Sequence, residues 1–188
     1  SHAVSYSILS YQCAWLLNYY PACWTAAFLD KEPEGRKESA ISLALKHGFE
    51  VDDVNINSST SQWEISESGD TLIQPLSSIK GLGDKAIEQI LINRPFNKIE
   101  DILFNKDVVH SKLGKKALDV LCRSGALDSL VDERFEGCQH FWMSCIQDKP
   151  KNPKRLKQNI EEFRKVCDGD FSKEQKIENV TSLTGLFP

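Results

Sequence analysis

Two glycines flank one leucine in the segment Ile79-Lys80-Gly81-Leu82-Gly83-Asp84-Lys85. Such a turn can adopt positive φ angles and leaves its backbone amides uncovered by side chains. The pattern that follows predicts an amphipathic helix over residues 84–93, and a helix start adds unpaired N–H groups and the positive end of the helix dipole. Together these groups could bind a phosphate. The alternative for so short a motif is a plain connector between helices.

The same pattern returns at a constant offset of 31 residues, which indicates a repeated supersecondary unit. Gly114-Lys115-Lys116-Ala117-Leu118 follows the order of Gly83-Asp84-Lys85-Ala86-Ile87, while Leu113 answers to Leu82 and Leu121 to Ile90. Lys112 stands where the first copy has Gly81, so we expect a less open second turn whose phosphate contact depends more on side chains. Two copies of helix, tight turn and helix resemble a tandem helix-hairpin-helix unit, which grips nucleic-acid backbone without reading bases.

The charge of the chain is unevenly distributed. The formal net charge is −4, whereas a general polyanion binder is usually positive overall. Residues 80–123 nevertheless hold nine lysines and arginines against six acidic residues. The alternative is a small helical bundle with solvated lysines. The predicted contacts to the DNA backbone are the amides and basic side chains of both turns: Lys80, Gly81, Leu82, Gly83, Lys85, Lys112, Gly114, Lys115 and Lys116.

A second basic cluster lies at residues 149–157, and the sequence leaves open whether it touches DNA backbone or forms a solvated helix face. The six cysteines form no C-x-x-C pair, and no histidine stands at zinc-finger spacing. We therefore expect reduced thiols and no disulfide framework. No metal site and no cofactor are expected in this chain. No signal peptide or membrane-length apolar run is visible, so a cytoplasmic protein is expected.

Hydrophobic periodicity and turn residues predict a mainly α fold with a small β-hairpin or short strands in the middle. The hairpin is expected at residues 63–73, an extended piece at 49–56, and a linker in the polar tract 57–61. Gly48 and Gly125 are expected to end helices. The predicted helices cover residues 4–18, 22–30, 36–47, 84–93, 99–105, 114–124, one stretch through 135–146, and 154–167.

The apolar and aromatic opening carries the most specific resemblance. The run from Ser1 to Leu16, followed by Tyr20-Pro21 and Ala26-Ala27-Phe28-Leu29, resembles the last part of the fingers domain in bacterial DNA polymerase III alpha subunits, the C family of replicative polymerases. Further segments resemble later parts of that family in the same order: His47 to Val51, Ile79 to Gly83, Pro95 to Asp101, Ser124 to Leu130, and Glu174 to Pro188.

This resemblance implies a helical fingers fragment and connector at residues 1–56, a tandem helix-hairpin-helix domain at 57–135 and a helical extension at 136–188. It places Ser1 and His2 near the phosphates of an incoming deoxynucleoside triphosphate and Tyr6 near its base; the alternative for Tyr6 is a core position. The Mg²⁺-binding carboxylates of the family lie in the palm, earlier than Ser1. No catalytic residue is therefore expected here, and the chain alone should not polymerise DNA.

The resemblance implies part of a replicative DNA polymerase, a nucleotidyltransferase whose partners are duplex DNA, a deoxynucleoside triphosphate and a palm-containing polypeptide. The alternatives are a stand-alone helix-hairpin-helix adaptor in a repair or replication complex and a structural helical scaffold. The tail from Ser182 to Phe187 fits a sliding-clamp peptide or, as we prefer, a structural segment. Ser1 is expected to be an internal position of a longer ancestor, in an excerpt, a polymerase encoded in pieces, or a product of an intein junction.

Overall fold

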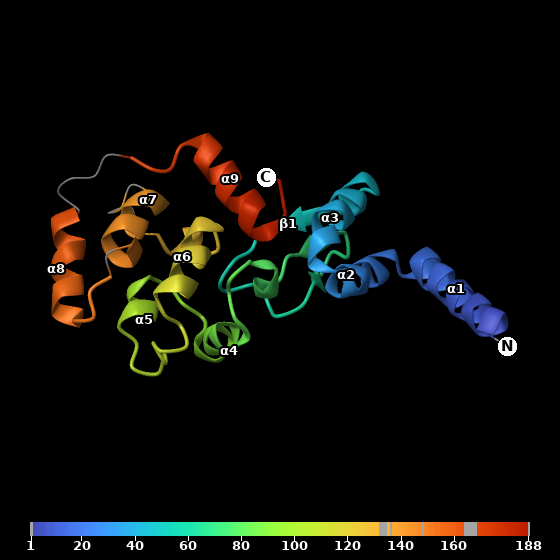
Figure 1. The fold of residues 1–188 in the computed structure, drawn as a ribbon, viewed down its shortest axis with the longest axis horizontal. Helices are drawn as coiled ribbons and strands as arrows, with labels where there is room; N and C mark the ends of the chain where they lie inside the picture. The colour runs from blue at the N-terminus through green and yellow to red at the C-terminus, as the bar shows by residue number, and fades with distance from the viewer. Residues whose placement is uncertain (1, 132–134, 136, 148, 164–168, 188) are drawn as a thin grey trace. The chain divides into compact units, whose positions relative to one another are not determined.

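The protein is described by a computed structural model over residues 2–131, 135, 137–147, 149–163 and 169–187 (Figure 1). It divides into two compact units. The first holds residues 1–52 and 62–74, and the second holds residues 53–61 and 75–188. The domain bounds expected from sequence, 1–56, 57–135 and 136–188, divide the chain by expected role and stay a prediction. The mainly α fold with short strands is confirmed.

The first unit combines three helices with a small sheet. Its elements are α1 (His2–Tyr19), α2 (Pro21–Lys31), the 3₁₀ turn η1 (Glu34–Arg36), α3 (Lys37–Lys46), β1 (Glu50–Asp52), β2 (Glu64–Ile65) and β3 (Thr71–Ile73). Pro21 starts α2 because proline suits the first helical position, where no backbone donor is needed. Gly48 follows α3 with φ +88°, as expected for a residue that ends a helix.

The predicted hairpin is confirmed. Strand β2 pairs antiparallel with β3, with Ile65 opposite Leu72, and Gly69 takes φ +84° in the turn between them. Strand β1 adds to the other edge of β3 in a parallel arrangement, which the sequence did not predict. A hydrogen bond from the Trp63 N–H to Asp30 Oδ1, 2.9 Å long, ties the hairpin to α2.

The second unit contains the repeated turns. Its elements are the 3₁₀ turn η2 (Leu76–Ser78), α4 (Asp84–Asn93), α5 (Glu100–Leu103), α6 (Lys115–Arg123), the 3₁₀ turn η3 (Asp128–Leu130), α7 (Cys138–Phe141), the π-helical η5 (Trp142–Gln147), α8 (Pro153–Phe163) and α9 (Lys173–Thr184). The corresponding apolar positions of the two repeats are all buried: Leu82, Leu113, Ala86, Ala117, Ile87, Leu118, Ile90 and Leu121. They share one hydrophobic core, to which α7, η5, α8 and α9 also contribute.

Two sequence expectations need correction in this unit. The polar tract 57–61 is packed and is not a linker: Asn57 Oδ1 accepts from the Phe96 N–H at 2.9 Å, Asn57 Nδ2 donates to the Phe96 carbonyl at 2.7 Å, and Ser59 is fully buried. The helix expected through residues 135–146 is a short α-helix that widens into a π-helix. The Ser144 hydroxyl binds the His140 carbonyl at 2.8 Å, which is the hydrogen bond that can loosen a helix at this spacing.

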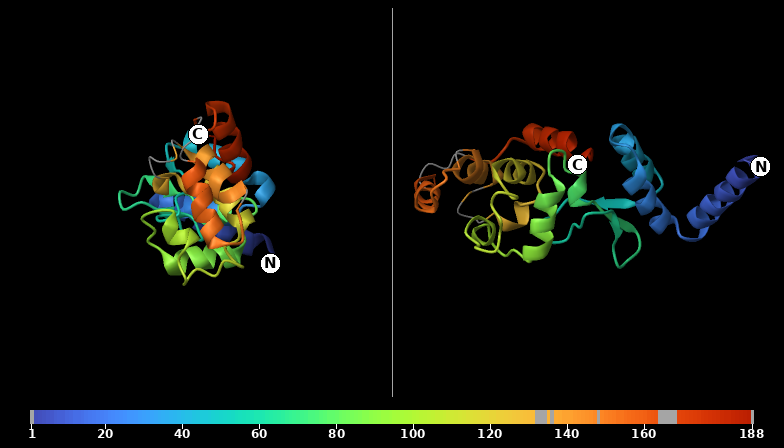
Figure 2. Two further views of the ribbon diagram at one scale, coloured as in Figure 1. Left: turned by 90° about the vertical axis from the view of Figure 1, so that its left-hand side faces the viewer. Right: turned by 60° about the horizontal axis from the view of Figure 1, so that its bottom comes forward.

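Helix α9 closes the second unit. Ser172 Oγ accepts from the Gln175 N–H at 3.2 Å and Gln175 Oε1 accepts from the Ser172 N–H at 2.9 Å, which forms a capping box at its start. Gly185 ends it with φ +75°. Figure 2 shows α9 in red beside α6, and the two helices are in contact.

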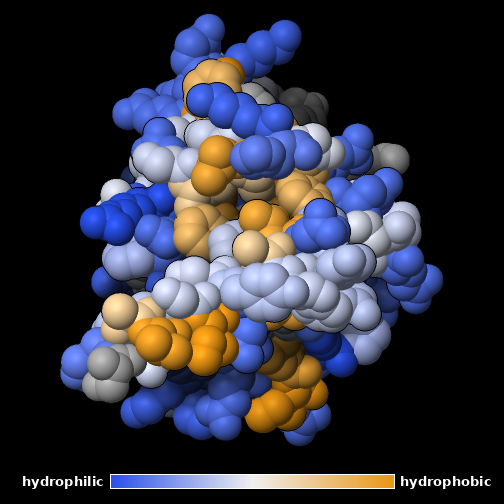
Figure 3. All heavy atoms as spheres, turned by 90° about the vertical axis from the view of Figure 1, so that its right-hand side faces the viewer, coloured by the Kyte–Doolittle hydropathy of each residue, from blue (hydrophilic) through white to orange (hydrophobic). Residues whose placement is uncertain are grey.

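The opening helix α1 leaves its side chains exposed over its whole described length. Figure 3, seen from the side on which α1 lies in Figure 1, shows hydrophobic side chains at the surface. Tyr6 is 68% exposed, so it is not a core residue of this chain. The other large exposed side chains of α1 are Val4, Ile8, Leu9, Tyr11, Trp15, Leu16, Leu17 and Tyr19. Such an apolar surface is typical of an interaction site.

Truncating a core residue shared by the two repeats should destabilise the second unit. Leu118 on α6 is completely buried, so Leu118→Ala is expected to cost about 2–5 kcal/mol of unfolding free energy. The matched control is Leu9→Ala on α1, where Leu9 is 55% exposed, and it should change stability little. Urea unfolding measures both, and equal losses would contradict the assignment of the core.

Candidate nucleic-acid interface

The two glycines of the first turn, Gly81 and Gly83, have different structural roles. Gly81 has φ +87°, a conformation that side chains other than glycine rarely adopt. Gly83 has φ −85° and ψ 156°, which any residue can adopt, and it stands immediately before α4 as its N-cap. A Cβ atom added at Gly83 would meet nothing within 4 Å. Gly83 therefore leaves open space in front of the start of α4.

The second turn repeats this geometry at α6. Gly114 is the N-cap with φ −89° and ψ −172°, close to the values at Gly83. Leu113 is fully buried beneath the turn, as Leu82 is nearly buried beneath the first. The segments that precede the two turns differ from the helix expected before each turn. A single 3₁₀ turn, η2, precedes the first turn, and eleven residues separate α5 from α6 at the second. The structural repeat thus consists of the turn and the helix that follows it.

Backbone N–H groups at both helix starts lack an acceptor among the residues that the structure describes. In the first turn the N–H of Leu82 binds the Ile79 carbonyl, and those of Ala86 and Ile87 bind Gly83. Within the part of the chain that the structure describes, no acceptor is found for the N–H groups of Gly81, Gly83, Asp84 and Lys85, nor for those of Gly114, Lys115 and Lys116 at the second turn. Such groups bind water or an anion.

The predicted lysines lie around these amides, with one difference in their arrangement. Lys80, Lys85, Lys115 and Lys116 are all exposed. Lys116 Cε lies 3.6 Å from the point that a Cβ atom would occupy if Gly81 had a side chain. This lysine of the second repeat therefore lies against the first turn. Lys112 Nζ is 3.6 Å from Glu88 Oε2, which gives it a partner on α4. The sequence repeat assigned Lys116 to its own turn and contained no signal for its contact with the first.

The first turn is also bound by the end of the chain. The N–H of Lys80 donates to the Leu183 carbonyl at 2.8 Å, so this amide is not available to a phosphate although the Lys80 side chain is exposed. Leu183 and Leu186 are buried, whereas Phe187 is 72% exposed. This packing supports the structural interpretation of residues 182–187, because a clamp could take the two leucines only after the segment detached.

The predicted nucleotide-proximal residues belong to the first unit, whereas both turns belong to the second. Ser1 lies outside the described residues, and His2 and Tyr6 are exposed on α1. In the described parts of the chain no group of three or more His, Cys, Asp or Glu side chains is arranged to hold a metal ion. None of the described helices is both long enough and apolar enough to cross a bilayer.

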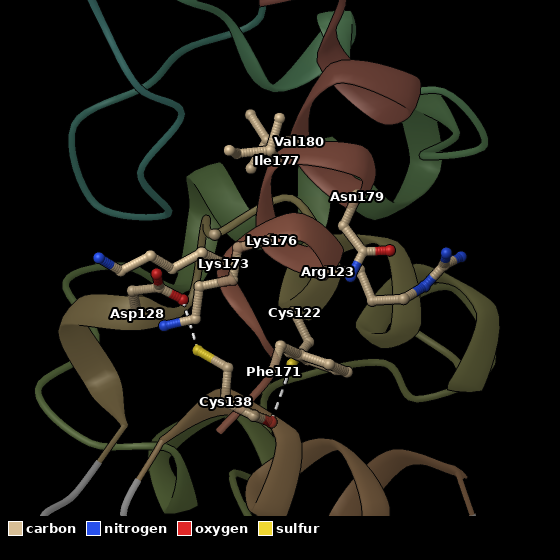
Figure 4. A pocket seen from close by; sticks show the side chains of 11 residues that line it. Cys122, Arg123, Asp128, Cys138, Phe171, Lys173, Lys176, Ile177, Asn179 and Val180 are labelled. Atoms are coloured by element: carbon tan, nitrogen blue, oxygen red, sulfur yellow. Dashed lines mark hydrogen bonds between the residues drawn. The ribbon is translucent and has the colours of Figure 1, made fainter. Parts of the chain in front are cut away.

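A separate cavity of about 350 Å³ lies between α6 and α9, and Figure 4 shows two cysteines in its wall. The Cys138 thiol donates to Asp128 Oδ1 at 2.6 Å, and the Cys122 thiol donates to the Cys138 carbonyl at 3.6 Å. Interaction with the Cys138 side chain, followed by burial, raises the pKa of Cys122 well above its usual value. A thiol held neutral in this way is a poor nucleophile, so we interpret Cys122 as a structural residue.

Comparisons with known proteins connect this geometry to a family. A model of the helix-hairpin-helix motif matches residues 48–136. DNA polymerase III subunit alpha of Xylella fastidiosa (strain Temecula1) is 35% identical over 144 residues, which are 71% of this chain and 12% of the relative. The corresponding subunit of Deinococcus radiodurans is 33% identical over 154 residues, 79% of this chain and 11% of the relative.

The chain is related in sequence to DNA polymerase III alpha subunits. The subunit of Escherichia coli (strain K12) adds a match of 28% identity over 140 residues, 71% of this chain and 12% of its own length. The chain thus spans about one eighth of the curated relatives it matches. The resemblance drawn from the sequence is confirmed, and the repeated turns lie in the part that the helix-hairpin-helix model matches.

The two glycines of the first turn should respond differently to alanine. Gly81→Ala places a side chain at φ +87° and should cost about 1–2 kcal/mol of unfolding free energy. Gly83→Ala should change it by less than about 0.5 kcal/mol, because its backbone is ordinary and the added Cβ meets no atom. Urea unfolding of both variants tests this, and a larger loss at Gly83 than at Gly81 would contradict the turn geometry.

Proposed function

We propose that this chain is part of a replicative DNA polymerase and holds duplex DNA by its phosphates without reading base sequence. The observation that carries the proposal is the pair of helix starts at Gly83 and Gly114, each with unpaired amides and exposed lysines, in a chain related to DNA polymerase III alpha subunits. Amides fixed in a turn bind a phosphate without losing side-chain entropy, and neighbouring lysines add charge.

The buried face of the repeats makes the two turns a rigid pair. Leu82 and Leu113 anchor the turns in a common core, and Val120 Cγ1 of α6 lies 3.6 Å from the Cβ position of Gly81. A rigid pair of phosphate sites fits a regular duplex backbone better than a flexible strand. Phosphate contacts fix the position of the protein on DNA and carry no base information, which suits an enzyme that must move along every sequence.

The remaining parts of the proposal follow from the family. His2 and Tyr6, with Ser1, would lie near the incoming deoxynucleoside triphosphate, and the exposed apolar surface of α1 would pack against the rest of the fingers. Polymerisation needs paired carboxylates that bind Mg²⁺ over the nucleotide and the primer end. We assign those carboxylates to a palm-containing polypeptide. This chain would then hold the duplex and help to position the incoming nucleotide, without supplying the metal-binding carboxylates.

Blocking the space before α4 should weaken DNA binding while leaving the fold intact. Gly83→Val places two methyl groups where a phosphate would approach the amides of Asp84 and Lys85, and duplex affinity should fall at least about tenfold. Gly35→Val is the matched control, because Gly35 also has open space around it and lies in the first unit. Fluorescence anisotropy with duplexes of two unrelated sequences measures the affinity, and unchanged binding of Gly83→Val would favour a structural scaffold.

Salt dependence identifies the source of the binding energy. The logarithm of the association constant should fall linearly with the logarithm of salt concentration, with a slope of about 0.9 per phosphate contact. Lys116→Gln should reduce that slope by about 1. Lys98→Gln, which removes an exposed lysine that is part of neither turn in the sequence, should leave the slope unchanged.

A part of a polymerase and a stand-alone adaptor differ in whether they restore primer extension to a palm-containing polypeptide. Mixing this chain with a DNA polymerase III alpha polypeptide that carries the palm but ends before the last part of the fingers should recover primer extension. The control is the same mixture with the Gly83→Val variant, which should extend primers less. Duplex binding without any gain in extension over the palm polypeptide alone would favour the adaptor.

A further inference from the structure

A second cavity, of about 530 Å³, opens beside the turn that precedes α6. Its floor is apolar, because the buried side chains of Leu103 and Leu156 line it together with Phe104. Its rim is basic and joins residues far apart in sequence: His110, Lys115, Lys149 and Lys151. No acidic residue is among the described residues that line it.

Two helix starts meet at this cavity. Gly114 and Lys115 are the N-cap and first residue of α6, and Pro153 is the first residue of α8. Asn152 fixes the start of α8, since its Oδ1 accepts from the Lys154 N–H at 2.9 Å and its carbonyl accepts from the Leu156 N–H at 3.0 Å. The positive ends of two helix dipoles therefore add to the charge of the rim.

The basic groups of the rim lack acidic partners among the described residues, in contrast to Lys112 with its partner Glu88. Burial lowers the pKa of Lys149. Burial and then the positive charge of Lys149 lower the pKa of His110. Both directions are consistent with Lys149 lying partly away from water and near His110, and an anion in the cavity would favour the protonated form of each.

Lys157 extends the positive rim over the aromatic part of the floor. Its Nζ lies 5.0 Å from the centre of the Phe104 ring. Figure 1 shows α8, which carries this lysine, next to α5, which Phe104 follows. The basic cluster 149–157 thus belongs in part to a cavity wall, and the sequence alone could not distinguish that from a solvated helix face.

We propose that the cavity beside the second turn binds the terminal phosphomonoester of a nucleotide, with the phosphate at Lys115, Lys149 and Lys151 and the nucleoside against the apolar floor of Leu103, Phe104 and Leu156. A terminal phosphate carries close to two negative charges at neutral pH, whereas an internal phosphodiester carries one. Several lysines lining one cavity suit the more highly charged group. A recess also admits a chain end more readily than the middle of a stacked duplex.

The nucleotide could be the 5′ end of a DNA strand held by the turns, which rests on the proposed function, or a free nucleotide. The first arm of the test uses a hairpin duplex with one 5′ end, carrying either a phosphate or a hydroxyl. Fluorescence anisotropy should show about tenfold tighter binding of the 5′-phosphorylated hairpin to the wild-type chain. Lys149→Gln and Lys151→Gln should each remove most of that gain while keeping the affinity for the 5′-hydroxyl hairpin.

Two controls accompany these variants. Lys173→Gln removes an exposed lysine of α9 outside the cavity and should keep the full gain. Thermal unfolding of all variants checks that the fold is retained, and Lys151, whose side chain is exposed, gives a second variant should Lys149→Gln reduce stability. The second arm titrates deoxyadenosine monophosphate and deoxyadenosine into ¹⁵N-labelled protein and follows the amide signals of residues 114, 115, 149 and 151 by NMR.

The outcomes separate this proposal from the proposed function. A gain from the 5′-phosphate that Lys149→Gln removes supports the strand end as the ligand. Shifts of those amides with the monophosphate and not with the nucleoside, without any duplex binding, support a free nucleotide and overturn the duplex-binding function. Equal affinity for both hairpins together with no shifts from the monophosphate overturns the cavity assignment, whether or not the duplex binds.

Discussion

The first N–H groups of an α-helix have no carbonyl acceptor within the helix. The candidate site depends on two helix starts, those of α4 and α6, at which such N–H groups remain open to an external acceptor. At Gly83 and at Gly114 the chain enters α4 and α6 through the same extended N-cap conformation. Neither N-cap supplies a side-chain oxygen to bind the free amides, as serine or aspartate would. An external acceptor is therefore the natural partner of both helix starts.

One hydrophobic core in the second unit joins the two helix starts. Leucines beneath each turn and matching apolar positions on α4 and α6 form one cluster, so the turns cannot move independently without opening it. The end of α9 adds a backbone hydrogen bond to the first turn through Lys80 and Leu183. That bond removes one amide from the candidate phosphate site and explains why the site must use the amides beyond Lys80.

The helices and the repeat could be predicted because their signals are local. Apolar spacing and Gly83 defined the start of α4 at the residue where the structure has it, and Gly48 and Gly125 take the left-handed conformation that glycine permits after a helix. The parallel pairing of β1 with β3 was missed, because nothing within a three-residue strand specifies its neighbour.

The parts that could not be predicted all depend on contacts between distant residues. In the sequence Asn57 has the appearance of a linker residue, but in the structure it binds both backbone groups of Phe96. Lys116 has the appearance of a solvated lysine, but in the structure it lies against Gly81. The π-helix at residues 142–147 occurs where the Ser144 hydroxyl donates to the His140 carbonyl, a contact of the kind that can loosen a helix. The candidate contact residues could be named from the sequence and stay a prediction, whereas their grouping around the first turn and around the cavity at Lys149 required the fold.

We infer that amides at the two helix starts bind the phosphates of a DNA backbone. The most direct measurement is a titration of the ¹⁵N-labelled chain with a blunt duplex whose 5′ ends carry hydroxyls, followed by amide chemical shifts. The account predicts that the signals of Gly83, Asp84 and Lys85 and those of Gly114, Lys115 and Lys116 shift together and most strongly, while that of Lys80, already bonded to Leu183, shifts less. Duplex binding that leaves both groups of amides unchanged would contradict it.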